Sequence, residues 1–313
     1  LQKSWVKFPD PDNTYPPNND NEWKGCVEAR IAPFDVLDDF DAAPTKNGPF
    51  RDSGEWAPYY WEAEPVRVNN PNSFSFVCQN DWLEPGTPIT LPLLTGRTPS
   101  NITLPLAKGN FFLDTIPPRT FGPNKACPDP IIPLTNDKKK LLNAIKKMEP
   151  WSGNGTMANL GAVWGWRVLS PEEPFNEGLP YSEEDNKKAI IILTDGQNLL
   201  SRQSFCASQV GNPRYNTHYS GYGYGEEGRL GPNSRTQINR ELNRRLSLVC
   251  ENIKQLDIFV STITFQLNDE DTKDIFRKCA TSPDDYYPSP DGDTLKSAFN
   301  AIAIKLNNLR IAR

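Results

Sequence analysis

The stretch that decides the fold runs Ala189-Ile190-Ile191-Ile192-Leu193 and passes directly into Thr194-Asp195-Gly196. A continuous apolar run closed by a turn signal predicts a strand buried on both faces, as in a parallel sheet. Ligands of open α/β sheets bind where strands end and helices begin. The sequence therefore predicts that a functional site lies just after Leu193, where the carboxylate of Asp195 stands.

Helical and extended patterns alternate around this strand. Apolar residues at spacings of three and four predict a long helix over 238–256 and shorter helices near 141–148, 156–169, 272–279 and 295–309. Apolar runs predict a strand at 258–265 and a brief edge strand at 286–287. This order predicts an α/β fold with a parallel sheet flanked by helices.

Residues 1–130 have a different character, with many prolines, asparagines, aspartates and aromatics but no sustained periodicity. The whole chain holds 30 prolines in 313 residues, which indicates many turns and extended segments. Short strands are predicted at 26–31, 74–78 and 102–106. We therefore divide the chain into a Pro- and aromatic-rich insertion, 1–130, and the α/β region, 131–313.

Composition argues against several classes of function. A net charge of −5 argues against a surface for nucleic acid or anionic membrane. The single histidine, His218, argues against His-rich zinc sites and most His-dependent acid–base catalysis, and no Gly-x-Ser-x-Gly or His-Glu-x-x-His motif is present. The sequence thus predicts a protein that is not an enzyme.

Six cysteines without a Cys-x-x-Cys pair favour three disulfides and an oxidising compartment, and six reduced thiols are the alternative. Cys250 and Cys279 flank the strand at 258–265, so the layout favours a disulfide between them.

Three kinds of residue are candidates for a site. Thr156, at a helix start, and Asp195 can ligate a hard cation, although each taken alone is better explained as a capping residue. Tyrosines follow the Asp195 turn in a Gly-rich loop and are candidates for a binding loop over it, with a mobile surface loop as the alternative. These are Tyr219, Tyr222 and Tyr224.

Together and in this order, Thr156 and Thr194-Asp195-Gly196 resemble the second and third motifs of the metal-ion-dependent adhesion site of von Willebrand factor A domains. Further motifs sharpen the resemblance to the TadG-type proteins of Tad/Flp pilus assembly. They are Trp23-Lys24-Gly25-Cys26-Val27-Glu28-Ala29-Arg30, Gly122-Pro123-Asn124, Pro130-Ile131-Ile132-Pro133-Leu134-Thr135 and Trp164-Gly165-Trp166-Arg167-Val168-Leu169-Ser170-Pro171. The resemblance covers nearly all of the chain, more loosely between residues 31 and 121.

The resemblance implies a von Willebrand factor A-like, Rossmann-type sheet in a bacterial envelope protein that is not an enzyme. Such a protein would contact other pilus-assembly or envelope proteins, in the periplasm or on the extracytoplasmic face of the inner membrane, held by an N-terminal anchor outside this chain. The alternatives are a carbohydrate- or matrix-binding adhesin and, less favoured, a metal-dependent hydrolase.

The chain departs from the family because the first metal motif, Asp-x-Ser-x-Ser, is absent. In the family that motif lies upstream, so we expect Leu1 to follow it and the sheet to lack its first strands. An exposed apolar strand edge would result, and we expect something to cover it.

Thr156 and Asp195 alone supply too few ligands for Mg²⁺ or Ca²⁺, which take about six or more. We predict weak or no specific metal binding by these 313 residues; Mg or Ca would enter only with the upstream motif. A thermal shift of several degrees on adding Mg²⁺ would contradict this.

The remaining disulfides are assigned with the resemblance. Cys26 and Cys127 each border a stretch that resembles the family, which favours their pairing and leaves Cys78 with Cys206. Six cysteines allow fifteen pairings, so non-reducing peptide mapping is the check.

Overall fold

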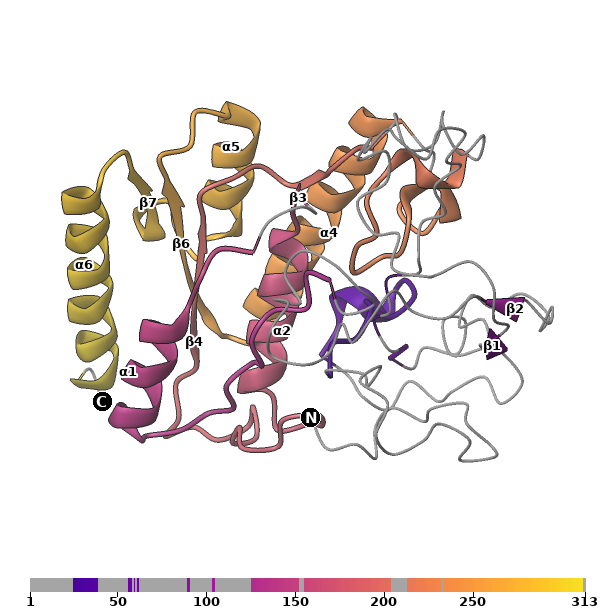
Figure 1. Cartoon of the computed structure of the whole chain (residues 1–313). Helices are drawn as coiled ribbons and strands as arrows, with labels where there is room; N and C mark the ends of the chain where they lie inside the picture. The colour runs from indigo at the N-terminus through magenta and orange to yellow at the C-terminus, as the bar shows by residue number, and fades with distance from the viewer. Residues whose placement is uncertain are drawn as a thin grey trace. The chain divides into compact units, whose positions relative to one another are not determined.

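The computed structural model describes residues 25–38, 56–57, 59, 61, 89–90, 103–104, 125–151, 155–203, 213–231 and 234–311 (Figure 1). The chain forms two compact units. Unit 1 comprises Leu1–Ile31, Ala42–Gly155 and Leu200–Asn233, and unit 2 comprises Ala32–Asp41, Thr156–Leu199 and Ser234–Arg313. The units alternate along the chain, whereas the sequence pattern predicts a single boundary, at residue 130.

Unit 2 is built on a parallel three-stranded sheet of the order β4-β6-β7. Its strands are β4 (Ala189–Thr194), β6 (Phe259–Phe265) and β7 (Tyr286–Ser289). β4 and β6 pair in register from Ala189 opposite Phe259 to Thr194 opposite Thr264. Helices lie on both sides of the parallel sheet, which confirms the predicted α/β class with a parallel sheet and is compatible with a Rossmann-like fold.

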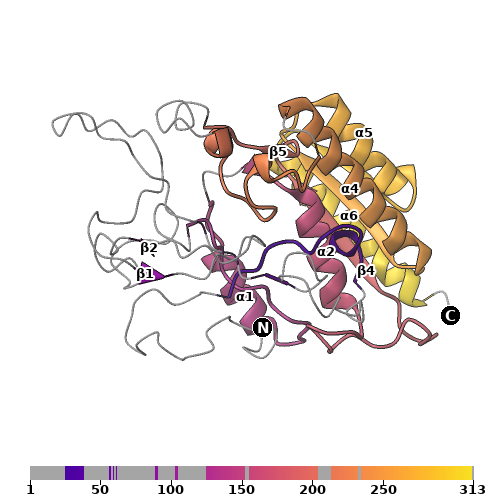
Figure 2. The same ribbon diagram turned by 90° about the vertical axis from the view of Figure 1, so that its right-hand side faces the viewer.

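One face of this sheet is covered by α2 (Ala158–Leu169), α4 (Arg235–Gln255) and α5 (Glu270–Cys279). α2 and α4 lie side by side (Figure 2). The apolar stripe predicted for α4 is buried, at Ile238, Leu242, Leu246, Val249 and Ile253. Gly165 lets α2 approach β4, since a Cβ there would lie 2.9 Å from Cδ1 of Ile190.

The opposite face is covered only in part, by α6 (Gly292–Ile311). Ala298 and Ile302 of α6 pack on Ile263 of β6. On β4, Ile191 is 39% and Leu193 44% exposed. The prediction that this strand is buried on both faces is therefore wrong, because α6 packs over β6 and β7 and not over β4, which is at one edge of the sheet among the described strands.

A short segment far upstream belongs to unit 2. The 3₁₀ helix η1 (Phe34–Val36) lies against α4 and α2. Asp35 is 1% exposed and accepts a hydrogen bond from Nη1 of Arg245. Nη2 of Arg167 donates to the carbonyl oxygens of Phe34, at 3.1 Å, and Leu37, at 2.9 Å. The buried charged groups of Asp35, Arg167 and Arg245 thus have hydrogen-bond partners, which offset the free-energy cost of removing them from water.

A disulfide joins Cys250 of α4 to Cys279 of α5, the pairing that the cysteine layout favours. The α5 helix is capped by Asp269, whose carboxylate accepts from the Thr272 backbone N–H at 2.8 Å. A 3₁₀ turn, η5 (Pro283–Asp285), then leads into β7, the brief edge strand predicted at 286–287.

In the described part of unit 1, the strands and helices are short. β1 (Ile89–Thr90) pairs antiparallel with β2 (Thr103–Leu104), within the strand predicted at 102–106. The predicted strand at 74–78 lies outside the described residues. No regular strand forms over 26–31, although the backbone N–H of Glu28 donates to Ala57 at 2.8 Å.

The remaining elements of the described chain are short. They are α1 (Lys138–Lys147), the paired strands β3 (Gly155–Thr156) and β5 (Leu199–Leu200), and the 3₁₀ helices η3 (Pro213–Asn216) and η4 (Gly225–Glu227). Within the described part of the chain, no helix combines the length and apolar character needed to cross a membrane.

Candidate functional site

The carboxyl end of β4 forms a tight hydrogen-bonded turn. Oγ1 of the buried Thr194 donates to the carbonyl oxygen of Gly196 at 2.8 Å, and the backbone N–H of Gly196 donates back to the same Oγ1 at 3.2 Å. The side chain of Asp195, between them, is exposed. A carboxylate is therefore presented at the sheet edge where ligands of α/β folds bind.

Thr156 lies against this turn. A Cβ on Gly196 would stand 3.1 Å from Oγ1 of Thr156, so the glycine leaves room for the hydroxyl. The structure thus brings together Thr156 and the turn that carries Asp195, which the sequence places 39 positions apart. Thr156 does not cap α2, which begins at Ala158 with Met157 at its N-cap.

Asn198 performs the capping that Thr156 does not. Its Oδ1 accepts from the backbone N–H of Ala158 at 2.8 Å, and its Nδ2 donates to Oδ1 of Asn243 at 2.9 Å. The side chain is 2% exposed. One buried amide therefore connects the β4 turn to the start of α2 and to α4. Sequence reasoning missed this residue, because an asparagine after Asp-Gly has the pattern of an ordinary turn.

We predict that Asn198→Ala lowers the free energy of unfolding of unit 2 by about 2 kcal/mol, since it removes a cap and leaves buried donors and acceptors unpaired. Asn198→Asp is the comparison, because it keeps the acceptor for Ala158 but replaces the donor to Asn243 and adds a buried charge, so it should also be destabilising. Urea unfolding at neutral pH measures both. Equal stability of Asn198→Ala and the unsubstituted protein would contradict the capping role.

The oxygen donors at this edge do not make a complete site for a hard cation. Thr156 offers one hydroxyl and Asp195 one carboxylate, whereas Ca²⁺ takes about six to eight oxygen ligands. Among the residues that the structure describes, no three His, Cys, Asp or Glu side chains gather where they could hold a metal ion. The described residues alone therefore do not fit Mg²⁺ or Ca²⁺, and weak or no specific metal binding remains the prediction.

The three tyrosines of the predicted binding loop are buried in unit 1. Tyr219, Tyr222 and Tyr224 are each 1% exposed. The Tyr219 ring lies 5.0 Å from that of Tyr224 and 5.2 Å from that of Tyr59, both edge-on. Edge-to-face aromatic pairs stabilise a core. In this arrangement the rings hold the loop in place and do not face solvent.

The same loop is fixed to the segment after Cys26 by a buried ion pair. Nη1 of Arg229 donates to Oε2 of Glu28 at 2.8 Å, and the Tyr219 hydroxyl donates to the same carboxylate. Cys26 is joined by a disulfide to Cys127, the pair that the resemblance favours. Cys78 and Cys206 lie outside the described residues.

His218 lies in this core and is 5% exposed. Its backbone N–H donates to the Ser201 carbonyl at 2.9 Å, and its ring meets Trp61 edge-on at 5.9 Å. Burial, followed by the charge of Lys125, lowers the pKa of His218 from 6.5 to about 4. The imidazole is therefore neutral at physiological pH and enclosed, which does not suit a catalytic base.

We predict that unit 1 loses stability as the pH falls from 6.5 to about 4, the two pKa values of His218 in the unfolded and folded chain. In that window the unfolded state binds a proton that the folded state excludes, and the loss reaches about 3 kcal/mol below it. His218→Gln removes this dependence. Subtracting the variant's stability–pH curve from that of the unsubstituted protein cancels the contributions of other titrating groups. One such group is Glu226, because burial raises its pKa. A flat difference curve would contradict the prediction.

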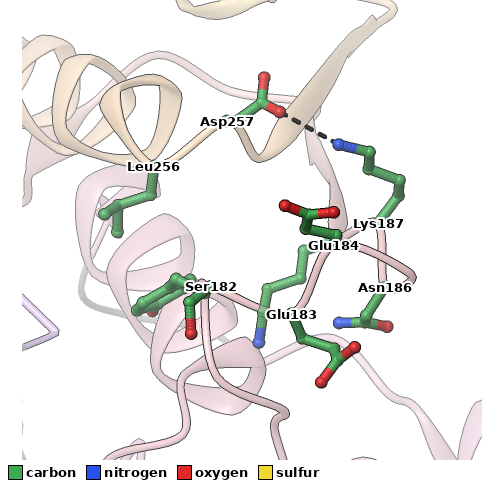
Figure 3. A pocket seen from close by; sticks show the side chains of 9 residues that line it. Ser182, Glu183, Glu184, Asn186, Lys187, Leu256 and Asp257 are labelled. Carbon is green, nitrogen blue, oxygen red and sulfur yellow. Dashed lines mark hydrogen bonds and ion pairs between the residues drawn. The ribbon is translucent and has the colours of Figure 1, made fainter.

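A pocket of about 340 Å³ opens in unit 2 at the opposite end of β4 (Figure 3). The residues around it are mostly charged or polar, and Nζ of Lys187 pairs with Asp257 across it at 3.3 Å. Nζ of Lys188 donates to the Leu179 carbonyl at 2.6 Å, and burial lowers its pKa. Both lysines are thus engaged, and the hydroxyl of Tyr181, which also lines the pocket, donates to Asp38.

Comparisons with known proteins give one match. No protein-family model matches the chain, and no curated protein matches it. Among solved structures, the pilus adhesin SpaC from Lactobacillus rhamnosus GG matches with a TM-score of 0.34 and 16% identity, over 55% of this chain and 21% of that chain. The match thus spans about a fifth of the adhesin, and a likeness this weak assigns neither family nor function.

Proposed function

We propose that the chain is a non-enzymatic envelope protein of tight-adherence (Tad/Flp) pilus assembly or adhesion, of the TadG type. Unit 2 would be its von Willebrand factor A-like part and would make protein–protein contacts at the carboxyl edge of the sheet. One observation carries the proposal: the Thr156 hydroxyl lies against Gly196, in the turn that presents Asp195. In a metal-ion-dependent adhesion site, the second and third motifs, which Thr156 and Thr194-Asp195-Gly196 resemble, are expected to lie together in this way.

The disulfides support the location that this function needs. Cys26–Cys127 in unit 1 and Cys250–Cys279 in unit 2 are both formed. Disulfides persist in oxidising compartments outside the cytoplasm. They suggest an extracytoplasmic protein, and the periplasm or the outer face of the inner membrane is the location we propose.

The contact role is favoured over catalysis by the position of the titratable groups. His218 is held in the aromatic core of unit 1. Asp195 is exposed beside a hydroxyl and a glycine, a setting that suits an interface better than general acid catalysis. Trp56 and Trp61 are 4% and 0% exposed, so these two rings offer no open stacking face for a sugar.

Binding of purified Tad pilus components to the immobilised chain tests the proposal. We expect pilin or an assembly protein to bind, and Asp195→Ala and Thr156→Val to weaken that binding at least about tenfold, the loss of roughly one good polar contact. The matched control is Asp257→Ala, whose carboxylate is 91% exposed in the turn before β6.

Other outcomes would overturn the proposal. Binding to a glycan array without binding to any pilus component would favour the carbohydrate- or matrix-binding adhesin. Turnover in a hydrolase panel, abolished by Asp195→Ala, would favour the enzyme. Equal loss of binding in Asp257→Ala and Asp195→Ala would show that the carboxyl edge of the sheet is not the contact surface.

A further inference from the structure

The loop that carries the three buried tyrosines, residues 213–231, is fastened to the rest of unit 1 at places spread from its start to its end. Near its start, the carbonyl oxygen of Asn216 accepts from the backbone N–H of Gln203 at 2.8 Å. In its middle, the carbonyl oxygen of Gly221 accepts from the backbone N–H of Ala29 at 2.7 Å. Near its end, Arg229 donates to the carbonyl oxygen of Ala29. We call this segment the tyrosine loop, and in the structure it is closed.

His218 is buried in the closed tyrosine loop without full hydrogen bonding. The residue is 5% exposed, and its Nδ1 has no hydrogen-bond partner within the described chain. A buried polar atom without a partner costs free energy, and an unpaired charge at the same position would cost more. The closed loop therefore accommodates a neutral imidazole and disfavours a protonated one.

A buried cation next to His218 also opposes its protonation. Nζ of Lys125 lies 4.2 Å from the centroid of the Trp61 ring, and the His218 ring meets the same indole edge-on at 5.9 Å. Trp61 is 0% and Lys125 3% exposed, so little water screens the two groups from each other. A protonated His218 would thus be a second buried cation beside one ring, and like charges disfavour ionisation.

The carboxylates that reach this region are already engaged. Glu28 accepts from the hydroxyl of Tyr219, and Glu226 accepts from Oγ1 of Thr217 at 3.1 Å. These contacts bring the two carboxylates to the chain neighbours of His218 and not to its Nδ1. The charged side chains on the described segments next to His218 are Lys125, Glu28, Arg202, Glu226 and Arg229.

We propose that the tyrosine loop is an acid-sensitive switch, in which protonation of His218 releases the loop from the core of unit 1 and exposes Tyr219, Tyr222 and Tyr224 to solvent. A histidine that is buried in its neutral form takes up a proton more readily once it is released, so acid favours the open loop. The Gly- and Tyr-rich composition typical of a binding loop is then presented in acid and hidden at neutral pH. This inference concerns unit 1 and does not depend on the proposed pilus function.

The structure allows the loop to open while the rest of unit 1 stays folded. At its C-terminal end, Gly228 and Gly231 have φ angles of 75° and 79°, and an added Cβ would meet no atom within 4 Å at either position. Glycine in such open space lets the backbone rotate. The part left behind has contacts of its own, because the Tyr59 backbone N–H donates to Cys26 at 2.8 Å and a disulfide joins Cys26 to Cys127. Segments held by separate sets of contacts can open separately.

The pH window of the switch follows from the pKa of His218, which is 6.5 in an open loop and about 4 in the closed one. Between these values the open loop binds a proton that the closed loop excludes. The equilibrium constant for opening therefore rises as the pH falls, by on the order of a hundredfold at about pH 4. Glu226 acts in the opposite direction, because burial raises its pKa and the closed loop binds its proton more readily.

Hydrogen exchange of the full chain, read by mass spectrometry at neutral pH and at about pH 4, measures the opening. The protection factor is the intrinsic exchange rate divided by the observed rate at the same pH, and it falls as the opening constant rises. We expect the protection of peptides covering 213–231 to fall on the order of a hundredfold. Peptides covering 56–61, where Tyr59 bonds to Cys26, should keep most of their protection.

Two substitutions of the histidine keep the test independent of any one variant. His218→Gln stays uncharged at both pH values, and His218→Phe keeps an aromatic ring beside Trp61. In both variants, the protection of peptides covering 213–231 should change no more with pH than that of peptides covering 56–61. Glu226→Gln is the matched control, since it removes another titrating group of the same loop, and the fall in protection should persist in it.

Three results would overturn the proposal. An equal loss of protection over 213–231 and 56–61 would mean that unit 1 unfolds as a whole. Unchanged protection over 213–231 would mean that the loop stays closed in acid. A loss as large in His218→Gln and His218→Phe as in the unsubstituted protein would assign the effect to another titrating group.

Discussion

Replacing Asp35 with alanine is expected to lower the free energy of unfolding of unit 2 by about 3–5 kcal/mol, the loss typical of a broken buried ion pair. The Asp35 side chain is 1% exposed and that of its partner Arg245 6%. Without Asp35, Arg245 keeps the ion pair of Nε with Glu241 at 2.9 Å, but part of a buried guanidinium loses its counter-charge. Hydrogen exchange of α4 and β6 peptides, read by mass spectrometry, measures the change in unit 2.

Arg244→Met is the matched control for this prediction. Arg244 pairs with the same Glu241, at 2.7 Å, but its side chain is 56% exposed. Surface ion pairs contribute less than about 1 kcal/mol, so this variant should remain close to the unsubstituted protein. If Asp35→Ala and Arg244→Met lowered the free energy of unfolding by equally small amounts, the buried Asp35–Arg245 pair would not be what stabilises η1 on α4.

Removing the Cys26–Cys127 disulfide by double alanine substitution is expected to destabilise unit 1 by about 4.7 kcal/mol, the chain-entropy value for a loop of that length. The bridge spans 101 residues. It restricts the unfolded chain around the segment that also carries the Glu28–Arg229 ion pair. Exchange should rise in peptides covering 213–231 and 56–61, and much less in β4 and β6.

The Cys250→Ala/Cys279→Ala pair provides the comparison, because it closes only 29 residues and lies in unit 2. The same relation gives about 3.6 kcal/mol for that loop. Its effect should appear in α4 and α5 peptides. Loss of protection spread evenly over both units in either variant would show that the two bridges do not act locally.

The regular part of unit 2 is readable from sequence because each element buries its own periodic stripe. The spacing of Ile238, Leu242 and Leu246 predicts α4, and the burial of all three confirms it. The strands at 189–194 and 259–265 follow from short apolar runs. These apolar runs do not indicate where a strand lies within the sheet. An edge strand without charged residues, proline or glycine has the same composition as a central strand.

The contacts that join distant segments were not predictable. Asp35 sits in a segment without periodicity and meets Arg245, 210 residues later. Asn198 caps a helix that begins 40 residues before it. In neither case does the sequence around the residue indicate which distant residue it contacts. The Thr156–Gly196 juxtaposition was anticipated only through a family resemblance, since two capping-type residues carry no signal of contact on their own.

The 210-residue separation of Asp35 and Arg245 also limits how early in synthesis unit 2 can fold. At roughly 5–20 residues per second, synthesis delivers the arginine some 10–40 s after the aspartate. Throughout that interval η1 lacks α4, one of the two helices on which it packs, and β4 lacks its partner β6 until residues 259–265 have been made. Unit 2 cannot assemble gradually from its N-terminus and must form once its last third has been made. The two disulfides suggest an extracytoplasmic location, and a unit 2 that cannot complete its fold before α4 is made would still lack its final packing if the chain were exported during synthesis.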